Sequence, residues 1–322
     1  MVKLTITKNE SSQRLDRFLK KYLKNAPLSH IYKLIRKDLK VNGKRAKIDT
    51  MLEEGDELCL YISQEQIDQY LKSQKANPVK RQFGIAYEDE KLIIVEKPFG
   101  LLTHGDAAEK KNTLANQVCG YLQQKGEYNP GRERTFVPSP VNRLDRNTTG
   151  LVLFGKNSQS LQLLNKMIRE RGFIAKQYLT IVAGSMDSPL VLEDRMEKDE
   201  TNNLVKVLPM DGERGKLMQT VARPLQIKGG FTLTEVELIT GRTHQIRAHL
   251  GQAGFPIIGD MKYGDRKVNE KVRKKFGLNT QLLHAQTLIF RKADPPLEYL
   301  QGREVRAQLP PSFERIKKEI FD

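Results

Sequence analysis

The chain has 322 residues, of which 38% are hydrophobic and 29% charged, and this composition indicates a folded globular protein rather than a disordered one. Lys and Arg number 55 against 39 Asp and Glu, and the net charge of +16 points to a polyanionic partner. No apolar run approaches the roughly 18 residues of a membrane helix, and the N-terminus lacks the apolar core of a signal peptide, so we expect a cytoplasmic protein without membrane association.

The length and the cysteines set further limits. A chain of this size predicts about two domains. Cys59 and Cys119 are isolated rather than part of a CxxC pair, so they predict neither a disulfide framework nor a thiol metal site. We expect both to be buried, unreactive thiols.

Positive charge is concentrated in residues 11–47, which contain twelve Lys or Arg and two Asp. Such a stretch is typical of proteins that bind polyanions, although a merely solvated basic face is the alternative. Apolar residues at helical spacing predict a helix here, with Ser11 or Ser12 as its N-cap: Leu15, Phe18, Leu19, Tyr22 and Leu23. A second, shorter amphipathic helix is predicted after Ser29 from Ile31, Tyr32, Leu34 and Ile35.

Turn signals follow the two helices. Asn42-Gly43 after Val41 predicts a tight hairpin turn, and Glu54-Gly55-Asp56 predicts another turn before a strand at 58–62. Residues 63–82 are polar, contain Pro78, and predict a linker or a short exposed helix. We therefore expect a small α/β module at 1–70, a linker at 71–83 and a second domain at 84–322.

The second part of the chain alternates between strand patterns and helix patterns. Apolar runs predict strands at 92–95, 151–154, 178–182 and 231–238, and residues 159–171 have apolar positions at helical spacing. The regular strand–helix–strand rhythm of a parallel sheet is missing. The order therefore predicts an α+β fold with a central mixed or antiparallel sheet flanked by helices.

The densest group of polar residues lies at 141–150, directly before the predicted strand at 151–154. Asp145 stands here between Arg143 and Arg146. Neighbouring positive charges favour the ionised carboxylate, and an ionised carboxylate can serve as a nucleophile. An ion-pair cluster on the surface is the alternative for such a run.

A second polar group lies at 240–250, where a glycine turn precedes a segment of helical character. Arg247 could bind a phosphate or pair with a carboxylate. His244 and His249 are not at the i, i+4 spacing of a zinc-binding helix, so we expect no metal site. The other histidines are scattered, and no Ser/His/Asp set is indicated.

Several ordered segments together resemble the signature blocks of the RluA-type pseudouridine synthases. They are KPFGLLTH (97–104), NRLDRNTTG (142–150), KQYL (176–179), TGRTHQIRAHL (240–250), GDMKYG (259–264) and LLHA (282–285). Residues 1–62 resemble the S-four-like RNA-binding module that many members carry ahead of the catalytic domain. Within the family, the chain resembles the branch that modifies large-subunit ribosomal RNA.

The resemblance implies roles for individual residues. Asp145 matches the catalytic aspartate that attacks the target nucleotide while the base detaches and rejoins through carbon. Tyr178 matches the tyrosine that stacks on the base and takes its proton, and a core aromatic is the alternative reading of this residue. Arg247 matches the basic partner of the aspartate, and Leu283 matches an apolar residue of the base pocket.

The resemblance also implies contacts with the rest of the substrate. Related enzymes push a side chain at the position of Arg143 into the RNA stack as the nucleotide swings out, although Arg143 could instead hold a phosphate. His104, Arg146 and Arg242 are expected to bind substrate. Many members have His in place of Asn142, and Asp-Thr-Ser in place of residues 147–149. These differences bear on substrate choice rather than on the reaction.

The sequence therefore predicts isomerisation of uridine to pseudouridine in structured RNA by a monomer that needs no cofactor and no metal. Ribosomal RNA is the expected substrate, and transfer RNA is the alternative. A non-catalytic RNA-binding or ribosome-assembly factor is a rival hypothesis that the basic module alone would explain. A metal-dependent nuclease is disfavoured because the second and third carboxylates of a metal pair are missing.

Overall fold

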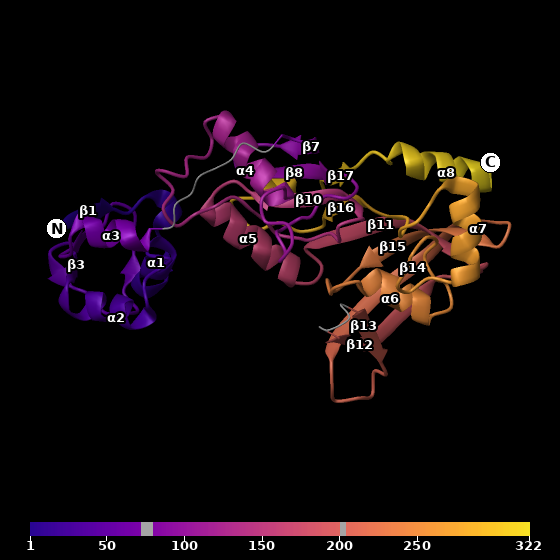
Figure 1. The fold of residues 1–322 in the computed structure, drawn as a ribbon, viewed down its shortest axis with the longest axis horizontal. Coiled ribbons are helices and arrows are strands. Elements are labelled where there is room, and N and C mark those ends of the chain that lie inside the picture. The colour runs from indigo at the N-terminus through magenta and orange to yellow at the C-terminus, as the bar shows by residue number, and fades with distance from the viewer. Residues whose placement is uncertain (72–79, 200–203) are drawn as a thin grey trace. The chain divides into compact units, whose positions relative to one another are not determined.

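The computed structural model describes residues 1–71, 80–199 and 204–322 and divides the chain into two compact units (Figure 1). The first unit comprises Met1–Arg81, Ala115–Ser139 and Gly155–Gln162, and the second comprises Gln82–Leu114, Pro140–Phe154 and Leu163–Asp322. Each unit is thus built from segments that are separated in the sequence.

A buried ion pair joins separate segments of the first unit. Arg134 donates to both carboxylate oxygens of the fully buried Glu10, from Nε at 2.8 Å and from Nη2 at 2.6 Å. The preceding residues, Asn9 and Glu133, also join the two segments: Asn9 Nδ2 donates to both carboxylate oxygens of Glu133 at 3.0 Å. The N-terminal residues are therefore fastened to the segment that contains Arg134.

The N-terminal residues form a four-stranded antiparallel sheet. Its strand order is β1 (Val2–Thr5), β6 (Glu57–Leu60), β3 (Leu39–Val41) and β4 (Lys44–Arg45), while β2 (Gln13–Arg14) pairs separately with β5 (Met51–Leu52). Val41 pairs with Lys44 across Asn42 and Gly43, whose φ angles of 51° and 77° are those that a type I′ hairpin turn requires. The predicted Asn-Gly turn is therefore confirmed.

Three helices cover this sheet: α1 (Leu15–Tyr22), α2 (Leu28–Lys37) and α3 (Gln64–Tyr70), and a short 3-10 turn, η1, spans Lys8–Glu10. Their apolar faces enter one core that includes Phe18, Ile31 and Ile67. The two predicted basic helices are thus confirmed. The predicted N-cap is wrong: Arg14 precedes α1 without a capping side chain, and Ser12 instead donates its backbone N–H to Leu52 O at 2.8 Å.

The expected linker is partly helical. Ser63 begins α3 with a capping box, and Ile67 is fully buried against the N-terminal core. Of the two alternatives for residues 63–82, the short helix therefore applies to Gln64–Tyr70. Residues 72–79, with Pro78, lie outside the described residues.

The large sheet is mixed. Its strands are β7 (Gly84–Glu88), β8 (Leu92–Lys97), β9 (Ser139–Pro140), β10 (Thr149–Gly155), β11 (Ile174–Ala183), β12 (Leu190–Asp199), β13 (Leu204–Leu208), β14 (Lys216–Lys228), β15 (Phe231–Leu238), β16 (Leu283–Phe290) and β17 (Glu304–Arg306). The order is β13-β12-β14-β15-β11-β16-β10-β8-β7, with β17 beside β16 and β9 beside β10. β10 and β16 run parallel, whereas β11 is antiparallel to both β15 and β16. The predicted α+β class and mixed sheet are confirmed.

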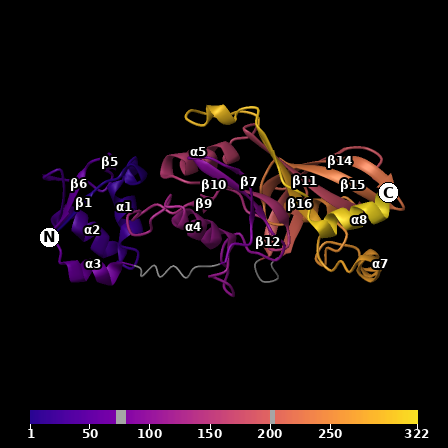
Figure 2. The same cartoon turned by 90° about the horizontal axis from the view of Figure 1, so that it is seen from above.

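Helices pack on this sheet through apolar faces. They are α5 (Ser158–Arg169), α6 (Gln245–Gln252), α7 (Arg266–Phe276) and α8 (Pro311–Phe321), and a 3-10 turn, η2, spans Glu298–Leu300. A further helix, α4 (Leu114–Gln124), belongs almost entirely to the first unit. α7 and α8 lie side by side (Figure 2) and share a core with β11 and β15 through Phe276, Phe313 and Ile181. No described helix reaches the length and apolarity that crossing a lipid bilayer demands.

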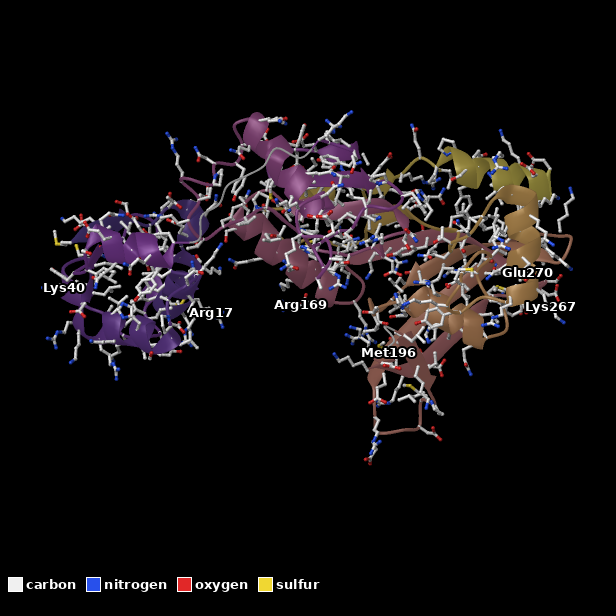
Figure 3. All side chains as sticks on the ribbon, in the orientation of Figure 1. Arg17, Lys40, Arg169, Met196, Lys267 and Glu270 are labelled. Atoms are coloured by element: carbon white, nitrogen blue, oxygen red, sulfur yellow. The ribbon has the colours of Figure 1, made fainter. Side chains whose placement is uncertain are left out.

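A small separate core joins α6 to the strands at one end of the sheet. Met196 on β12 (labelled in Figure 3) is buried with Val205, Met218 and Ala248, the last of which belongs to α6. The β12–β13 hairpin therefore supports the helix that carries Arg247.

The two cysteines are free thiols. Cys59 is buried in β6, and Cys119 is partly buried in α4. Burial raises the pKa of the Cys119 thiol to about 12, which keeps it protonated at neutral pH and therefore poorly nucleophilic.

Candidate active site

Asp145 lies in the loop between β9 and β10, and hydrogen bonds fix the backbone on either side of it. Thr103 Oγ1 donates to Leu144 O at 3.0 Å and lies 3.2 Å from Leu144 N. Thr148 N–H donates to Asp145 O at 3.1 Å, which closes a turn directly after the carboxylate. The loop therefore presents Asp145 from a defined backbone position.

A buried lysine ties this loop to the end of β8. Lys97 is 1% exposed, and its Nζ donates to the carbonyl oxygens of Pro98 (3.1 Å), Leu101 (2.7 Å) and Arg146 (2.8 Å). Burial lowers the pKa of Lys97 to about 7, although the nearby charge of Asp145 acts in the opposite direction. Two segments that are distant in sequence, 97–104 and 142–150, thus meet at one amine.

Two amide side chains, those of Asn142 and Asn147, join the loop to its surroundings. Asn142 Nδ2 donates to Leu151 O at 3.1 Å, and its Oδ1 accepts from Leu153 N–H at 2.9 Å. Asn147 Nδ2 donates to Thr280 Oγ1 at 3.0 Å. Asn142 therefore both donates and accepts, and it joins the loop to β10.

Close contact between β10 and β16 explains the glycine that follows the loop. Gly150 has a φ of 108°, and a Cβ at this position would lie 2.1 Å from Ala285 O. No other residue can occupy this position without displacing the backbone of β16. The parallel pairing of β10 with β16 brings Leu283, at the start of β16, toward the loop that carries Asp145.

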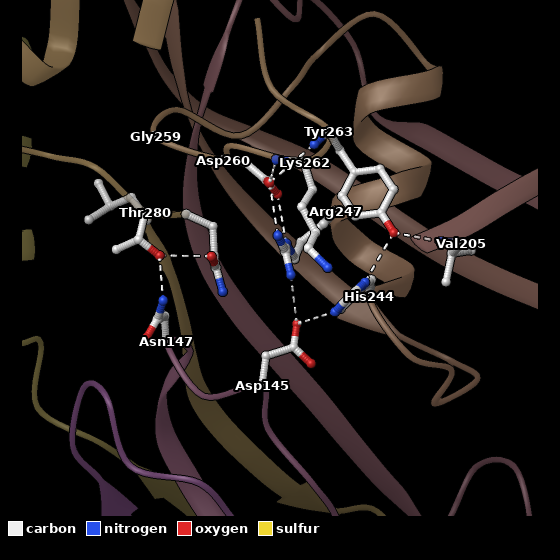
Figure 4. A network of polar contacts seen from close by, with 12 residues as sticks. Asp145, Asn147, Val205, His244, Arg247, Gly259, Asp260, Lys262, Tyr263 and Thr280 are labelled. Carbon is white, nitrogen blue, oxygen red and sulfur yellow. Dashed lines mark hydrogen bonds and ion pairs between the residues drawn. The ribbon is translucent and has the colours of Figure 1, made fainter. Parts of the chain in front are cut away.

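Arg247 on α6 joins two carboxylates (Figure 4). Its Nε and Nη2 donate to Asp260 at 2.7 and 2.8 Å, and its Nη1 donates to Asp145 Oδ2 at 3.1 Å. The side chains of Arg247 and Asp260 are 7% and 0% exposed, so the pair is protected from solvent screening. Asp260 thus holds two nitrogens of the guanidinium and leaves a third for Asp145.

The ionised forms of this pair are mutually stabilised. Burial alone would raise the pKa of Asp260, but the hydrogen bonds and charge of Arg247 lower it below its usual value. Burial would lower the pKa of Arg247, but Asp260 and Asp145 raise it. The site therefore has a permanent positive charge next to the Asp145 carboxylate.

Tyr178 on β11 lines the same pocket as Asp145 and Leu283, together with Leu238 and Ile246. The tyrosine is 6% exposed, and burial, with a further contribution from the charge of Asp145, raises the pKa of its phenol. The ring is therefore neutral in the free protein. A neutral aromatic face beside apolar side chains is suited to stacking on a nucleobase.

All eight residues singled out from the sequence lie at two adjoining pockets that share Arg143, Asp145 and Arg247. The smaller pocket is lined in addition by Tyr178, Arg242 and Leu283. The larger cavity, of about 520 Å³, is lined in addition by His104 and Arg146. The structure therefore brings all eight residues to one region of the second unit.

Most of the charged side chains that line the larger cavity are basic. Arg143 and Arg146 are exposed, and Lys198 and Lys262 lie at the same cavity. Arg146 is also 3.4 Å from Asp106, with both side chains about half exposed. Exposed guanidinium and ammonium groups of this kind are suited to the phosphates of a nucleic acid.

Sequence patterns assigned no role to Asp260, His244 or Tyr263, although all three belong to the quoted blocks. The sequence does contain a signal for them: His244 lies close to Arg247 in segment 240–250, and Asp260 lies close to Tyr263 in segment 259–264. His244 and His249 do not converge: His244 faces Tyr263, while His249 contacts Thr220. Across the described ranges, no three His, Cys, Asp or Glu side chains are grouped as a metal site would need.

Comparison with known proteins gives matches that agree with one another. Residues 91–252 match the model of a family described as RNA pseudouridylate synthase. The chain is 32% identical over 320 residues to ribosomal large subunit pseudouridine synthase C of Vibrio vulnificus (strain CMCP6), covering 98% of this chain and 95% of the relative. It is 33% identical over 302 residues to the protein of that name from Escherichia coli (strain K12), covering 89% and 88%.

Solved structures share the fold. Human RNA pseudouridylate synthase domain containing 4 superposes with a TM-score of 0.57 over 73% of this chain and 92% of the human chain, at 23% identity. Human RNA pseudouridylate synthase domain containing 1 gives a TM-score of 0.52 over 76% and 96%, at 19% identity.

Proposed function

The chain belongs to the RNA pseudouridylate synthase family, and from this premise we propose that it converts specific uridines of large-subunit ribosomal RNA to pseudouridine. The choice of RNA is supported by the names of the relatives, which are ribosomal large subunit enzymes in two bacteria. The high positive charge of the chain is consistent with such a polyanionic substrate.

The proposed reaction begins with Asp145. One carboxylate oxygen attacks the sugar carbon C1′, and the electron pair of the C1′–N1 bond passes to the departing uracil. The freed base turns, and its C5 forms a bond to C1′ as the carboxylate departs. The proton on C5 is then lost to a base, and N1 gains a proton from solvent, so that the product is neutral. The observation that carries this proposal is the ion pair between Asp145 and Arg247, which holds the carboxylate at the wall of a pocket that Tyr178 also lines.

The other residues of the site are proposed to bind the substrate. Tyr178 and Leu283 would contact the extruded uracil from the two walls of the smaller pocket. Arg143 is exposed and lines both pockets, so it is placed to enter the RNA stack as the nucleotide leaves it. His104, Arg146 and Arg242 would contact the flanking backbone.

We assign RNA clamping to a module of residues 1–70. Its twelve basic residues between 11 and 47 are mostly exposed, and within the described chain only Arg14 and Lys20 form ion pairs with acids, both with Asp16. Most of this charge is therefore left for phosphates, which position the protein without reading the sequence.

The proposed function is tested with an Asp145→Asn variant on large-subunit ribosomal RNA. Asn keeps the size of the side chain but is a poor nucleophile, so pseudouridine formation is expected to disappear while the affinity for RNA changes little. Product is measured by mapping pseudouridines at single-nucleotide resolution, and affinity by filter binding.

The control is Asp187→Asn, which removes an exposed carboxylate from the loop between β11 and β12 and is expected to react normally. Normal turnover by Asp145→Asn would overturn the nucleophile assignment. Normal turnover on transfer RNA with none on ribosomal RNA would overturn the proposed substrate.

A further inference from the structure

His244 occupies an unusual backbone position beside the reacting carboxylate. It precedes α6 with a φ of 52°, in the left-handed region that side chains other than glycine rarely adopt. Its ring lines both pockets, and its Nε2 lies 3.8 Å from Asp145 Oδ2, which is too long for a hydrogen bond. A strained residue at a reaction centre points to a function for its side chain.

A chain of hydrogen bonds decides which ring nitrogen of His244 carries the proton (Figure 4). The backbone N–H of Val205 donates to Tyr263 Oη at 2.7 Å, and Tyr263 Oη lies 3.0 Å from His244 Nδ1. The phenol oxygen accepts one hydrogen bond from Val205, and donation of its single proton to His244 Nδ1 satisfies both groups, so this arrangement favours Tyr263 as the donor. Nδ1 is then an acceptor, and a neutral ring must carry its proton on Nε2.

Burial of His244 favours the neutral ring, while the charged groups around it act in both directions. Two carboxylates, Asp145 and Asp260, face it from the β9–β10 loop and from the loop after α6, and two cations, Arg247 and Lys262, face it from α6 and from that second loop. The charges oppose one another, and burial, which is the largest contribution, lowers the pKa of His244 below its usual value. The ring is therefore uncharged at neutral pH.

We propose that His244 is a catalytic hydrogen-bond donor and that Tyr263 is the positioning residue that fixes its tautomer. The inference rests on the proposed function and deepens it. When the C1′–N1 bond breaks, its electron pair passes to the uracil, which becomes an anion whose charge is shared between N1 and the carbonyl oxygens O2 and O4. The Nε2–H of His244 donates to the oxygen nearest C1′, O2, and keeps its own proton throughout.

A neutral donor suits this position better than an imidazolium would. Asp145 is already paired with Arg247, and a second cation at His244 would reduce its capacity to attack, whereas a neutral N–H adds no further positive charge beside the carboxylate. Because the charge on that oxygen develops only as the bond breaks, the contact strengthens in the transition state and acts on kcat rather than on KM.

The first test is nitrogen NMR of the imidazole rings in the full chain labelled with ¹⁵N-histidine. The protein has five histidines, and loss of one signal set in His244→Gln assigns the residue. We expect an unprotonated Nδ1 and a protonated Nε2 at neutral pH, with a mixture of tautomers in Tyr263→Phe. A proton on Nδ1 in the unmodified protein, or an imidazolium at neutral pH, would overturn the proposal.

The second test is turnover of RNA by the same variants. His244→Ala is expected to lower kcat about 100-fold with KM little changed, as for the loss of one donor to a developing oxyanion. His244→Gln keeps an amide N–H near the position of Nε2 and should recover most of this loss. Tyr263→Phe should lower kcat by about three- to tenfold, since the ring is then free to exchange tautomers.

Tyr299→Phe is the matched control, because it removes a phenol that donates to Asp89 at 2.7 Å in a different part of the chain. It should change neither the His244 signals nor kcat. Unaltered kcat in His244→Ala, with an active parent enzyme, would overturn the donor role alone. An inactive parent enzyme would overturn the proposed function, while the NMR result would still report the tautomer.

Discussion

At the scale of single residues, the site depends on a buried acid that does not face the pockets. Asp260 holds Arg247 through two hydrogen bonds and also accepts the backbone N–H of Lys262 at 2.9 Å. The direction of the guanidinium toward Asp145 is therefore set by Asp260. The partly exposed carboxylate of Asp145 would hold the arginine less firmly by itself, because ion pairs weaken as solvent reaches them.

Asp260→Asn tests this dependence. The substitution removes the buried one of the two carboxylates that pair with Arg247, and we expect the free energy of unfolding to fall by about 3 kcal/mol. Turnover should fall as well, because Arg247 would no longer be oriented toward Asp145. Urea denaturation and single-turnover kinetics measure the two effects, with Asp187→Asn as the exposed control; unchanged stability and rate in Asp260→Asn would contradict the argument.

At the scale of elements, the parallel pairing of β10 with β16 assembles the pocket. Thr149 pairs with His284, and Gly150 pairs with Ala285, so the start of β16 lies next to the end of the Asp145 loop. β11 then pairs with β16 on its other side and contributes Tyr178 opposite Ala285. Three consecutive strands of the sheet, β11, β16 and β10, therefore carry or adjoin the residues of the base pocket.

Gly150→Ala should disrupt this arrangement. The new methyl group would lie 2.1 Å from Ala285 O, and the φ of 108° is unfavourable for alanine. We expect a loss of more than about 2 kcal/mol in the free energy of unfolding, together with loss of turnover. Thermal and urea denaturation provide the measurement.

Gly120→Ala is the matched glycine substitution. Gly120 lies inside α4, and a Cβ there would meet no atom within 4 Å. Alanine should therefore raise the stability by about 0.5–1 kcal/mol, because it restricts the unfolded chain and favours the helix. If Gly150→Ala and Gly120→Ala changed the free energy of unfolding equally, the close approach of β16 to Gly150 would not be the cause of the destabilisation.

At the scale of the whole molecule, positive charge and chemistry belong to different parts of the chain. Twelve basic residues lie between residues 11 and 47, six of them on α1 and α2, whereas the reacting carboxylate lies after β9. Binding through phosphates depends on salt because counterions are released, whereas attack by Asp145 on a bound nucleotide does not. Substitutions of basic residues in the module should therefore change the affinity for RNA, whereas substitutions of Asp145 should change turnover.

A triple variant of α2 tests this separation. Replacing the exposed Lys33, Arg36 and Lys37 by Gln should weaken RNA binding and reduce the slope of log affinity against log salt by up to about 2 to 3, with single-turnover rates at saturating RNA unchanged. The control replaces three exposed lysines on α7, Lys267 (labelled in Figure 3), Lys271 and Lys274, with the same loss of charge. If both variants reduced the slope of log affinity against log salt equally, the cause would be the net charge of the protein. That result would contradict a clamping role for the module.

Local patterns in the sequence determined much of this protein. Helical spacing indicated α1, α2 and α5, the Asn-Gly pair indicated the β3–β4 turn, and the contiguous blocks around Asp145 and Arg247 indicated the family. These features depend on backbone preferences and on burial of one face, which neighbouring residues encode.

Only the tertiary structure decided the partners of these residues. The bond from Ser12 to Leu52 displaced the expected N-cap, and Asp260 and Tyr263 gained their importance through contacts with Arg247 and His244. Such contacts depend on strand register and on how α6 packs against the sheet. No local periodicity reports these quantities, because a hydrogen bond between distant segments is fixed by the position of every element between them.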